Sequence, residues 1–214
     1  MTPTRARHVH LVVAVVAWAA VVLQLGLVVS GSAVLVDQDP PGLGERVYRF
    51  FAYFTIQSNL LVALTSTALA RDPALDRPGW RVARLAGLVG ITVTGLVHFF
   101  LLRPLLDLDG ADWLADKLLH VVVPLLAVVG WAVFGPRGLA DRRLLWPSLV
   151  YPVGWLAYTL VSGGVAGWYP YPFLDVGLQG YPKALLACAG VAVLLLALTQ
   201  VAIVLDRRLP GERT

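Results

Sequence analysis

The sequence predicts an all-α integral membrane protein, a single bundle of six transmembrane helices with both termini cytoplasmic. Hydrophobic residues make up 58% of the 214 residues and charged residues only 14%, whereas soluble domains average roughly 45–50% and about 25%. The mean hydropathy is +0.74. Six apolar runs have about 20 residues each, which is enough to cross a bilayer. They cover approximately 10–29, 50–70, 82–102, 113–134, 144–161 and 182–205.

The first apolar run follows a basic segment, MTPTRARH, so a signal peptide is the competing interpretation. The run is longer than the core of a signal peptide, and no clean small-residue cleavage site follows it. We therefore expect a retained helix. The later runs are separated by short connections containing Pro, Gly and Asp, which are typical of turns. The whole chain, 1–214, is thus expected to form one domain.

The basic residues predict the orientation of the bundle, because cytoplasmic loops are enriched in Arg and Lys. The loops at 31–49, 103–117 and 162–181 are expected to face outward. The two termini and the loops around 71–84 and 135–143 are expected on the cytoplasmic side. These four segments hold most of the basic residues, namely Arg5, Arg7, Arg71, Arg77, Arg81, Arg84, Arg137, Arg142, Arg143, Arg207, Arg208 and Arg213.

The net charge of +4 and the pI near 9.5 do not indicate nucleic-acid binding, because the charges lie in short loops between apolar runs. The basic residues are almost all arginine, and the apolar residues are rich in Ala, Val and Leu. This bias is typical of a GC-rich bacterial genome and favours a multi-pass protein of the bacterial inner membrane. The single cysteine, Cys188, excludes an internal disulfide and a cysteine-based metal cluster.

Four of the expected spans carry polar residues at a similar depth near the outer surface. Thr55 lies in the second span, His98 in the third and His120 in the fourth, while Tyr158 and Ser162 approach the same edge from the fifth. At 1.5 Å rise per residue, five to seven residues correspond to roughly 8–10 Å of depth. Because polar groups are costly in lipid, we expect these side chains to face a shared cavity.

Thr55 is the candidate nucleophile of this layer. Thr55, Ser58 and Asn59 share one helical face, being separated by three and four positions. A threonine needs a base within hydrogen-bond reach in order to attack a carbonyl. Ser58 or Asn59 is a candidate donor to the resulting oxyanion. The structural alternative is a threonine that bonds the carbonyl four residues earlier in its own helix.

His120 is the candidate base. Asp116 lies four residues earlier, so its side chain can reach the imidazole and fix its tautomer. Pro124 lies four residues later and removes the helical partner of the His120 carbonyl, which predicts a kink. His98 is a second candidate base. Metal binding by His98, Asp116 and His120 is a weaker alternative, because the spacing lacks an HExxH-type pattern, and we expect neither a metal nor a cofactor.

The segment GWYPYPFLD, 167–175, is dense in aromatic rings and prolines. Such a segment is typical of an interfacial aromatic belt with a rigid turn. It is also placed to cover the mouth of the cavity, and Trp168 is a candidate pocket residue. We expect a structural lid rather than a direct role in chemistry.

Three segments carry a resemblance to a known family, namely RFFAYFTIQ around Thr55, DWLADKLLHVVVP around His120, and GWYPYPFLD. Together they resemble the androgen-induced protein family of multispanning membrane threonine hydrolases. The resemblance covers most of the chain, and it implies hydrolysis of fatty acid esters of hydroxy fatty acids by Thr55 and His120. Asp116 is not implied by the resemblance and rests on its spacing. The residues after Thr55 and the spacing from His120 to Pro124 depart from the animal pattern.

These observations leave two functional hypotheses. The first is an intramembrane lipid ester hydrolase whose partners are membrane lipids and a fatty acyl ester substrate. The second is a non-enzymatic membrane carrier or sensor of lipids or small hydrophobic molecules. The second expects Thr55 Oγ and the His120 ring to lie far apart, and Thr55 to be replaceable by valine at little functional cost.

Overall fold

The structure, a computed structural model, describes residues 3–32 and 41–209. These residues are folded into helices with no strand among them, as the sequence predicts. Five helical stretches are long and apolar enough to cross a membrane, which makes this a membrane protein by length and composition. They are Thr4–Ser30, Pro78–Leu105, Gly110–Phe134, Arg142–Ala166 and Tyr181–Arg208.

The apolar run at 50–70 is not a single helix, contrary to the expectation from its composition. It contains the end of α2 (Leu43–Ala52) and most of α3 (Phe54–Arg71), which meet at an extended Tyr53 with φ −67° and ψ 128°. Groups far along the chain satisfy the backbone at this break. The Trp155 indole N–H donates to the Ala52 carbonyl at 2.9 Å, so tertiary contacts rather than local sequence allow the helix to break at membrane depth.

Both candidate histidines lie in π-helical turns, which insert an extra residue and often mark functional sites. Helix α4 (Pro78–Val97) continues as the π-turn η1 (His98–Leu102) and the 3-10 turn η2 (Arg103–Leu105). Helix α5 (Gly110–Lys117) continues through the π-turn η3 (Leu118–Val122) into α6 (Val123–Phe134). The outer connection expected over 103–117 therefore ends in a helix. The predicted kink before Pro124 takes the form of a π-turn.

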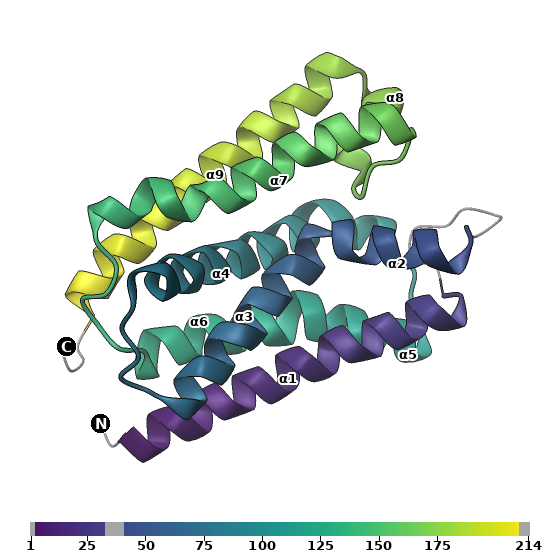
Figure 1. Ribbon diagram of the computed structural model, residues 1–214. Helices are drawn as coiled ribbons and strands as arrows, with labels where there is room; N and C mark the ends of the chain where they lie inside the picture. The colour runs from purple at the N-terminus through teal and green to yellow at the C-terminus, as the bar shows by residue number, and fades with distance from the viewer. Residues whose placement is uncertain (1–2, 33–40, 210–214) are drawn as a thin grey trace.

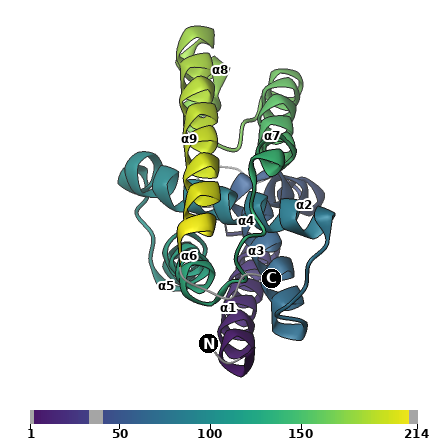
Figure 2. The same ribbon diagram turned by 90° about the vertical axis from the view of Figure 1, so that its left-hand side faces the viewer.

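The helices are arranged around α3 and α4, which pack against each other (Figure 1). Helix α1 (Pro3–Ser30) packs along α3 and α6 on one side. On the other side of α4 lie α7 (Leu145–Ala166) and α9 (Tyr181–Arg208), as Figure 2 shows from the end of the bundle. One apolar cluster joins α1, α3 and η3, and a second joins α4, α7 and α9.

The connection between α7 and α9 folds over one end of the bundle. Gly167 ends α7 in the left-handed conformation with φ 68°, which glycine adopts without steric cost. A 3-10 turn, η5 (Pro172–Leu174), and the short α8 (Val176–Gln179) follow. Asp175 caps α8 by accepting the N–H groups of Gly177 and Leu178. We call residues 167–175 the cap loop.

Large apolar side chains cover the outside of the bundle. Examples are Val165, Leu186, Val150 and Trp146, which are 69–86% exposed. Apolar patches of this extent are rare on soluble proteins, whereas hydrocarbon chains would cover them in a membrane.

Candidate functional site

A cavity of about 160 Å³ lies where the α2–α3 break, η1, η3 and the cap loop meet. Apolar side chains form much of its wall. Arg46 and Arg49 also line it. Its other polar side chains include Thr55, His98, Asp116, His120 and Tyr171. Thr55 of α3, His98 of η1 and His120 of η3 thus share one cavity, whereas the predicted polar layer also included two residues at the end of the fifth apolar run, Tyr158 and Ser162, which do not line it.

Thr55 is the second residue of α3 and is buried. Its Oγ lies 3.3 Å from His120 Nε2. The same Oγ lies 3.1 Å from the Tyr171 hydroxyl. The backbone N–H of Thr55 donates to that hydroxyl, also at 3.1 Å. The nucleophile candidate therefore contacts a base on one side and a phenol on the other.

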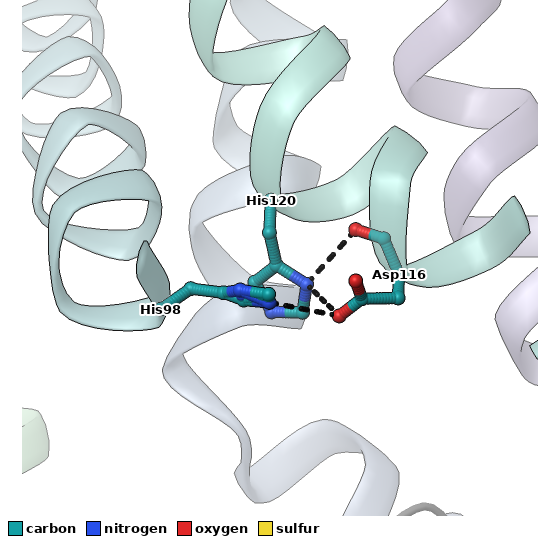
Figure 3. Close-up of side chains that lie close together, drawn as sticks. All are labelled: His98, Asp116 and His120. Atoms are coloured by element: carbon teal, nitrogen blue, oxygen red, sulfur yellow. Dashed lines mark hydrogen bonds and ion pairs between the residues drawn. The ribbon is translucent and has the colours of Figure 1, made fainter. Parts of the chain in front are cut away.

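Asp116 orients the His120 ring. His120 Nδ1 lies 3.0 Å from the Asp116 carbonyl oxygen and 3.0 Å from Asp116 Oδ1 (Figure 3). Both oxygens are acceptors, so Nδ1 carries the proton. The lone pair of the neutral ring is then on Nε2 and points toward Thr55 Oγ. This is the tautomer that a general base requires.

His98 shares the same carboxylate. Its Nε2 donates to Asp116 Oδ1 at 3.0 Å, and its ring stacks on His120 with centroids 4.0 Å apart and planes at 16° (Figure 3). Lys117 Nζ donates to Asp116 Oδ2 at 2.7 Å. Asp116 is only 4% exposed, and these three donors offset the cost of burying its charge.

The potential ligand atoms of His98, Asp116 and His120 all lie within 4.8 Å of one another. A metal ion binds in the plane of an imidazole ring, along the nitrogen lone pair. Two rings that stack almost in parallel cannot both contain one ion in their planes. As these side chains are arranged, the cluster fits two N–H groups donating to a carboxylate better than it fits a metal centre.

Tyr171 contacts Thr55 directly, although the sequence did not single it out. The cap loop places its hydroxyl against Thr55, and its side chain is buried. Its ring packs against Tyr53, Trp155 and Phe173 at centroid distances of 5.4–5.9 Å. Burial raises the pKa of the Tyr171 phenol, so the hydroxyl keeps its proton. The aromatic and proline content of the segment indicated a rigid loop but not which ring points inward.

Trp168, also on the cap loop, lines the cavity as expected. Its ring contacts Tyr53 edge-on at 5.9 Å and lies under the Arg49 guanidinium at 4.8 Å.

Four other candidates do not line this cavity. Ser58 bonds the Thr55 carbonyl and Thr94 Oγ. Asn59 Nδ2 donates to the carbonyls of Thr55 at 2.8 Å and Leu119 at 3.2 Å, so Asn59 ties α3 to η3 instead of facing a ligand. Tyr158 and Ser162, the two candidates on α7, form a separate cluster at the surface, where both side chains hydrogen-bond to the Tyr48 hydroxyl.

No protein-family model, curated protein or solved structure matches this chain.

Proposed function

We propose that the protein is an intramembrane hydrolase of lipid esters, with Thr55 as nucleophile and His120 as general base. The observation that carries the proposal is the connected arrangement of Thr55 Oγ, His120 Nε2 and Asp116. A nucleophile, a base within hydrogen-bond reach and a group that orients the base are the parts that acyl transfer needs. The carrier or sensor hypothesis expects Thr55 and His120 far apart, and the 3.3 Å distance favours the hydrolase.

In the proposed reaction, Thr55 Oγ attacks the ester carbonyl carbon while its proton passes to His120 Nε2. The carbonyl bond becomes a C–O⁻ single bond in the tetrahedral intermediate. When the carbonyl re-forms, the bond to the alcohol oxygen breaks, and the alkoxide takes the proton from His120. Water then attacks the Thr55 ester with the same help from His120, which releases the fatty acid and regenerates Thr55.

The cavity supports a lipid as the substrate. Val28, Phe50, Ile56, Leu102 and Leu119 are among its lining residues, and such a surface suits an acyl chain. The resemblance of the three segments around Thr55, around His120 and at 167–175 extends the proposal to fatty acid esters of hydroxy fatty acids. This reaction requires no metal, cofactor or nucleic acid.

The proposal includes six spans, with α3 as the sixth. Its 18 residues correspond to roughly 27 Å of helix. Neighbouring helices cover its polar side chains, and α1 and α4 are its main contacts. We further propose that both termini are cytoplasmic, in a bacterial inner membrane. The start of α1 and the end of α9 lie at the same end of the bundle (Figure 1), where Arg7 donates to the Arg71 carbonyl.

A fluorophosphonate probe tests the nucleophile directly, because it bonds covalently to an activated hydroxyl. Peptide mapping of the labelled protein should locate the adduct on Thr55. Thr55→Ala and His120→Ala should abolish it. The matched controls are Thr65→Ala and His8→Ala. Thr65 bonds carbonyls of its own helix, and exposed His8 bonds the Thr4 carbonyl, so both controls should label like the wild type. No adduct in folded wild-type protein would argue against the hydrolase.

The competing candidate is a metal-dependent hydrolase, because the potential ligand atoms of His98, Asp116 and His120 lie within 4.8 Å of one another, although the stacked rings would have to reorient to share one ion. Metal analysis of the purified protein separates the two. A stoichiometric metal ion, with ester hydrolysis lost in chelator and restored by the metal, would support the competing candidate. Hydrolysis that persists in chelator, together with the Thr55 adduct, supports the threonine mechanism.

A further inference from the structure

We infer that Tyr171 is a further catalytic residue, whose hydroxyl and the backbone N–H of Thr55 together bind the oxyanion formed at Thr55. The inference rests on the proposed ester hydrolysis and deepens it by assigning a part of the site that neither His120 nor Asp116 supplies. A tetrahedral intermediate needs donors placed where its negative charge develops, and such donors are often the largest single contribution to catalysis.

The first donor is set by the break at Tyr53. Thr55 is the second residue of α3, and the N–H groups of a first helical turn have no partner within the helix. They also carry the partial positive charge of the helix N-terminus. In serine proteases of the chymotrypsin type the nucleophile's own backbone N–H is one of the oxyanion donors. The Thr55 N–H has the same covalent relation to its Oγ.

The Tyr171 hydroxyl lies against the two Thr55 atoms that would contact an ester group. It lies 3.1 Å from both Thr55 N and Thr55 Oγ. Its oxygen accepts the Thr55 N–H, which leaves its own proton free to point at Oγ. Thr55 in turn points its proton at His120 Nε2. The directions of all three hydrogen bonds are therefore consistent with one another and with the neutral tautomer of His120.

Substrate binding changes the acceptors but not the donors. The carbonyl oxygen of a bound ester replaces the Tyr171 oxygen as the acceptor of the Thr55 N–H. The Tyr171 O–H then turns from Thr55 Oγ to that carbonyl oxygen. As the negative charge grows on the oxygen, both bonds become charge-assisted and strengthen. Tyr171 keeps its proton throughout, so the atom balance of the hydrolysis is unchanged.

The other polar side chains on this face of α3 are already committed elsewhere. Ser58 bonds Thr94, and both hydrogen bonds of Asn59 Nδ2 go to backbone carbonyls. The position of Tyr171 is fixed by packing: its ring lies against Tyr53, Trp155 and Phe173. An oxyanion donor needs this kind of preorganisation, since it must be in place before the charge develops.

Tyr171→Phe tests the inference, because it removes the hydroxyl and keeps the ring. We expect the maximal rate of labelling by a fluorophosphonate, whose P=O oxygen also gains negative charge, to fall about 100-fold or more. The concentration of probe for half-maximal rate should stay near the wild-type value. The matched control is Tyr169→Phe on the same cap loop, whose ring packs against Gly163 away from the cavity; it should label at the wild-type rate.

The outcomes separate this inference from the hydrolase itself. If the wild type labels on Thr55 and Tyr171→Phe labels equally fast, Tyr171 is not an oxyanion donor and the hydrolase stands. A change confined to the half-maximal probe concentration would show that Tyr171 only shapes the cavity, which also overturns the inference. If the wild type does not label, the hydrolase and this inference fail together. Melting curves of both variants would show that the fold is retained.

Discussion

Asp116 is the residue on which both histidines depend. One of its carboxylate oxygens accepts from His98 Nε2 and His120 Nδ1, and the other accepts from Lys117. In the proposed reaction His120 becomes an imidazolium when it takes the proton of Thr55, and the nearby negative charge would stabilise that state. The same contact keeps the proton on Nδ1 beforehand. In the proposed mechanism Asp116 thus acts through His120 without touching the substrate.

Asp116→Asn should preserve the size of the side chain and remove its charge. The amide supplies an NH₂ group that competes with the histidine donors, so the tautomer of His120 is no longer fixed. By analogy with the same change in serine proteases, we expect the labelling rate of Thr55 to fall by about 10³–10⁴-fold. Asp109→Asn is the control, because Asp109 is exposed at the start of α5. Wild-type labelling by Asp116→Asn would remove Asp116 from the mechanism.

At this scale the sequence predicted some contacts and missed others for a physical reason. Asp116 and His120 are four residues apart on a helix, so their contact follows from local geometry. The proximity of Thr55 to His120 was expected from their shared depth and from the resemblance. The contact of Tyr171 with Thr55 joins residues 116 positions apart through an irregular loop, and no periodicity encodes which ring of WYPYPF turns inward.

At the scale of elements, the site depends on departures from regular helix. The π-turns at His98–Leu102 and Leu118–Val122, and the break at Tyr53, bring the two histidines and Thr55 into one cavity. Pro124 indicated a distortion near His120 because it lacks an N–H. The break at Tyr53 has no proline or glycine to mark it. It is stabilised by Trp155 and Tyr171, which the local sequence does not reveal.

Gly95 controls how closely α4 approaches η3. A Cβ on Gly95 would lie 3.3 Å from both the His120 carbonyl oxygen and Pro124 Cβ, and these rigid groups yield little. Gly95→Ala should therefore destabilise the protein by about 1–3 kcal/mol through overpacking. It should also slow Thr55 labelling, because His120 is displaced from Thr55.

The control for this prediction is Gly154→Ala, since nothing lies within 4 Å of a Cβ built there in α7. Gly154→Ala should be neutral or slightly stabilising, because alanine favours helix over glycine. Thermal melting in detergent and the labelling rate measure the two effects. If Gly95→Ala melts and labels like the wild type, the close approach of α4 does not position His120.

At the scale of the whole molecule, composition predicted the all-helical membrane fold because lipid permits few alternatives. Backbone groups in lipid must be hydrogen-bonded within the protein, and a helix achieves this inside its own segment, so long apolar runs become helices. Helix α3 is the instructive case. It carries more polar residues than the five helical stretches that are apolar enough to cross a membrane, and its neighbours bury Thr55, Ser58 and Asn59. The segment least suited to lipid is therefore at the centre of the bundle and carries the nucleophile candidate.

The proposed orientation places the cavity toward the outer face, and single-cysteine labelling can test it. Cys188 is the one cysteine in the sequence, so Cys188→Ala gives a cysteine-free background. In that background Leu178→Cys lies on exposed α8 beside the cap loop, and Arg208→Cys lies at the exposed end of α9. A membrane-impermeant thiol reagent should label Leu178→Cys in intact cells. It should label Arg208→Cys only after permeabilisation, because arginine-rich segments remain in the cytoplasm. The reverse pattern would place the cavity on the cytoplasmic side, where an ester substrate would have to come from the inner leaflet.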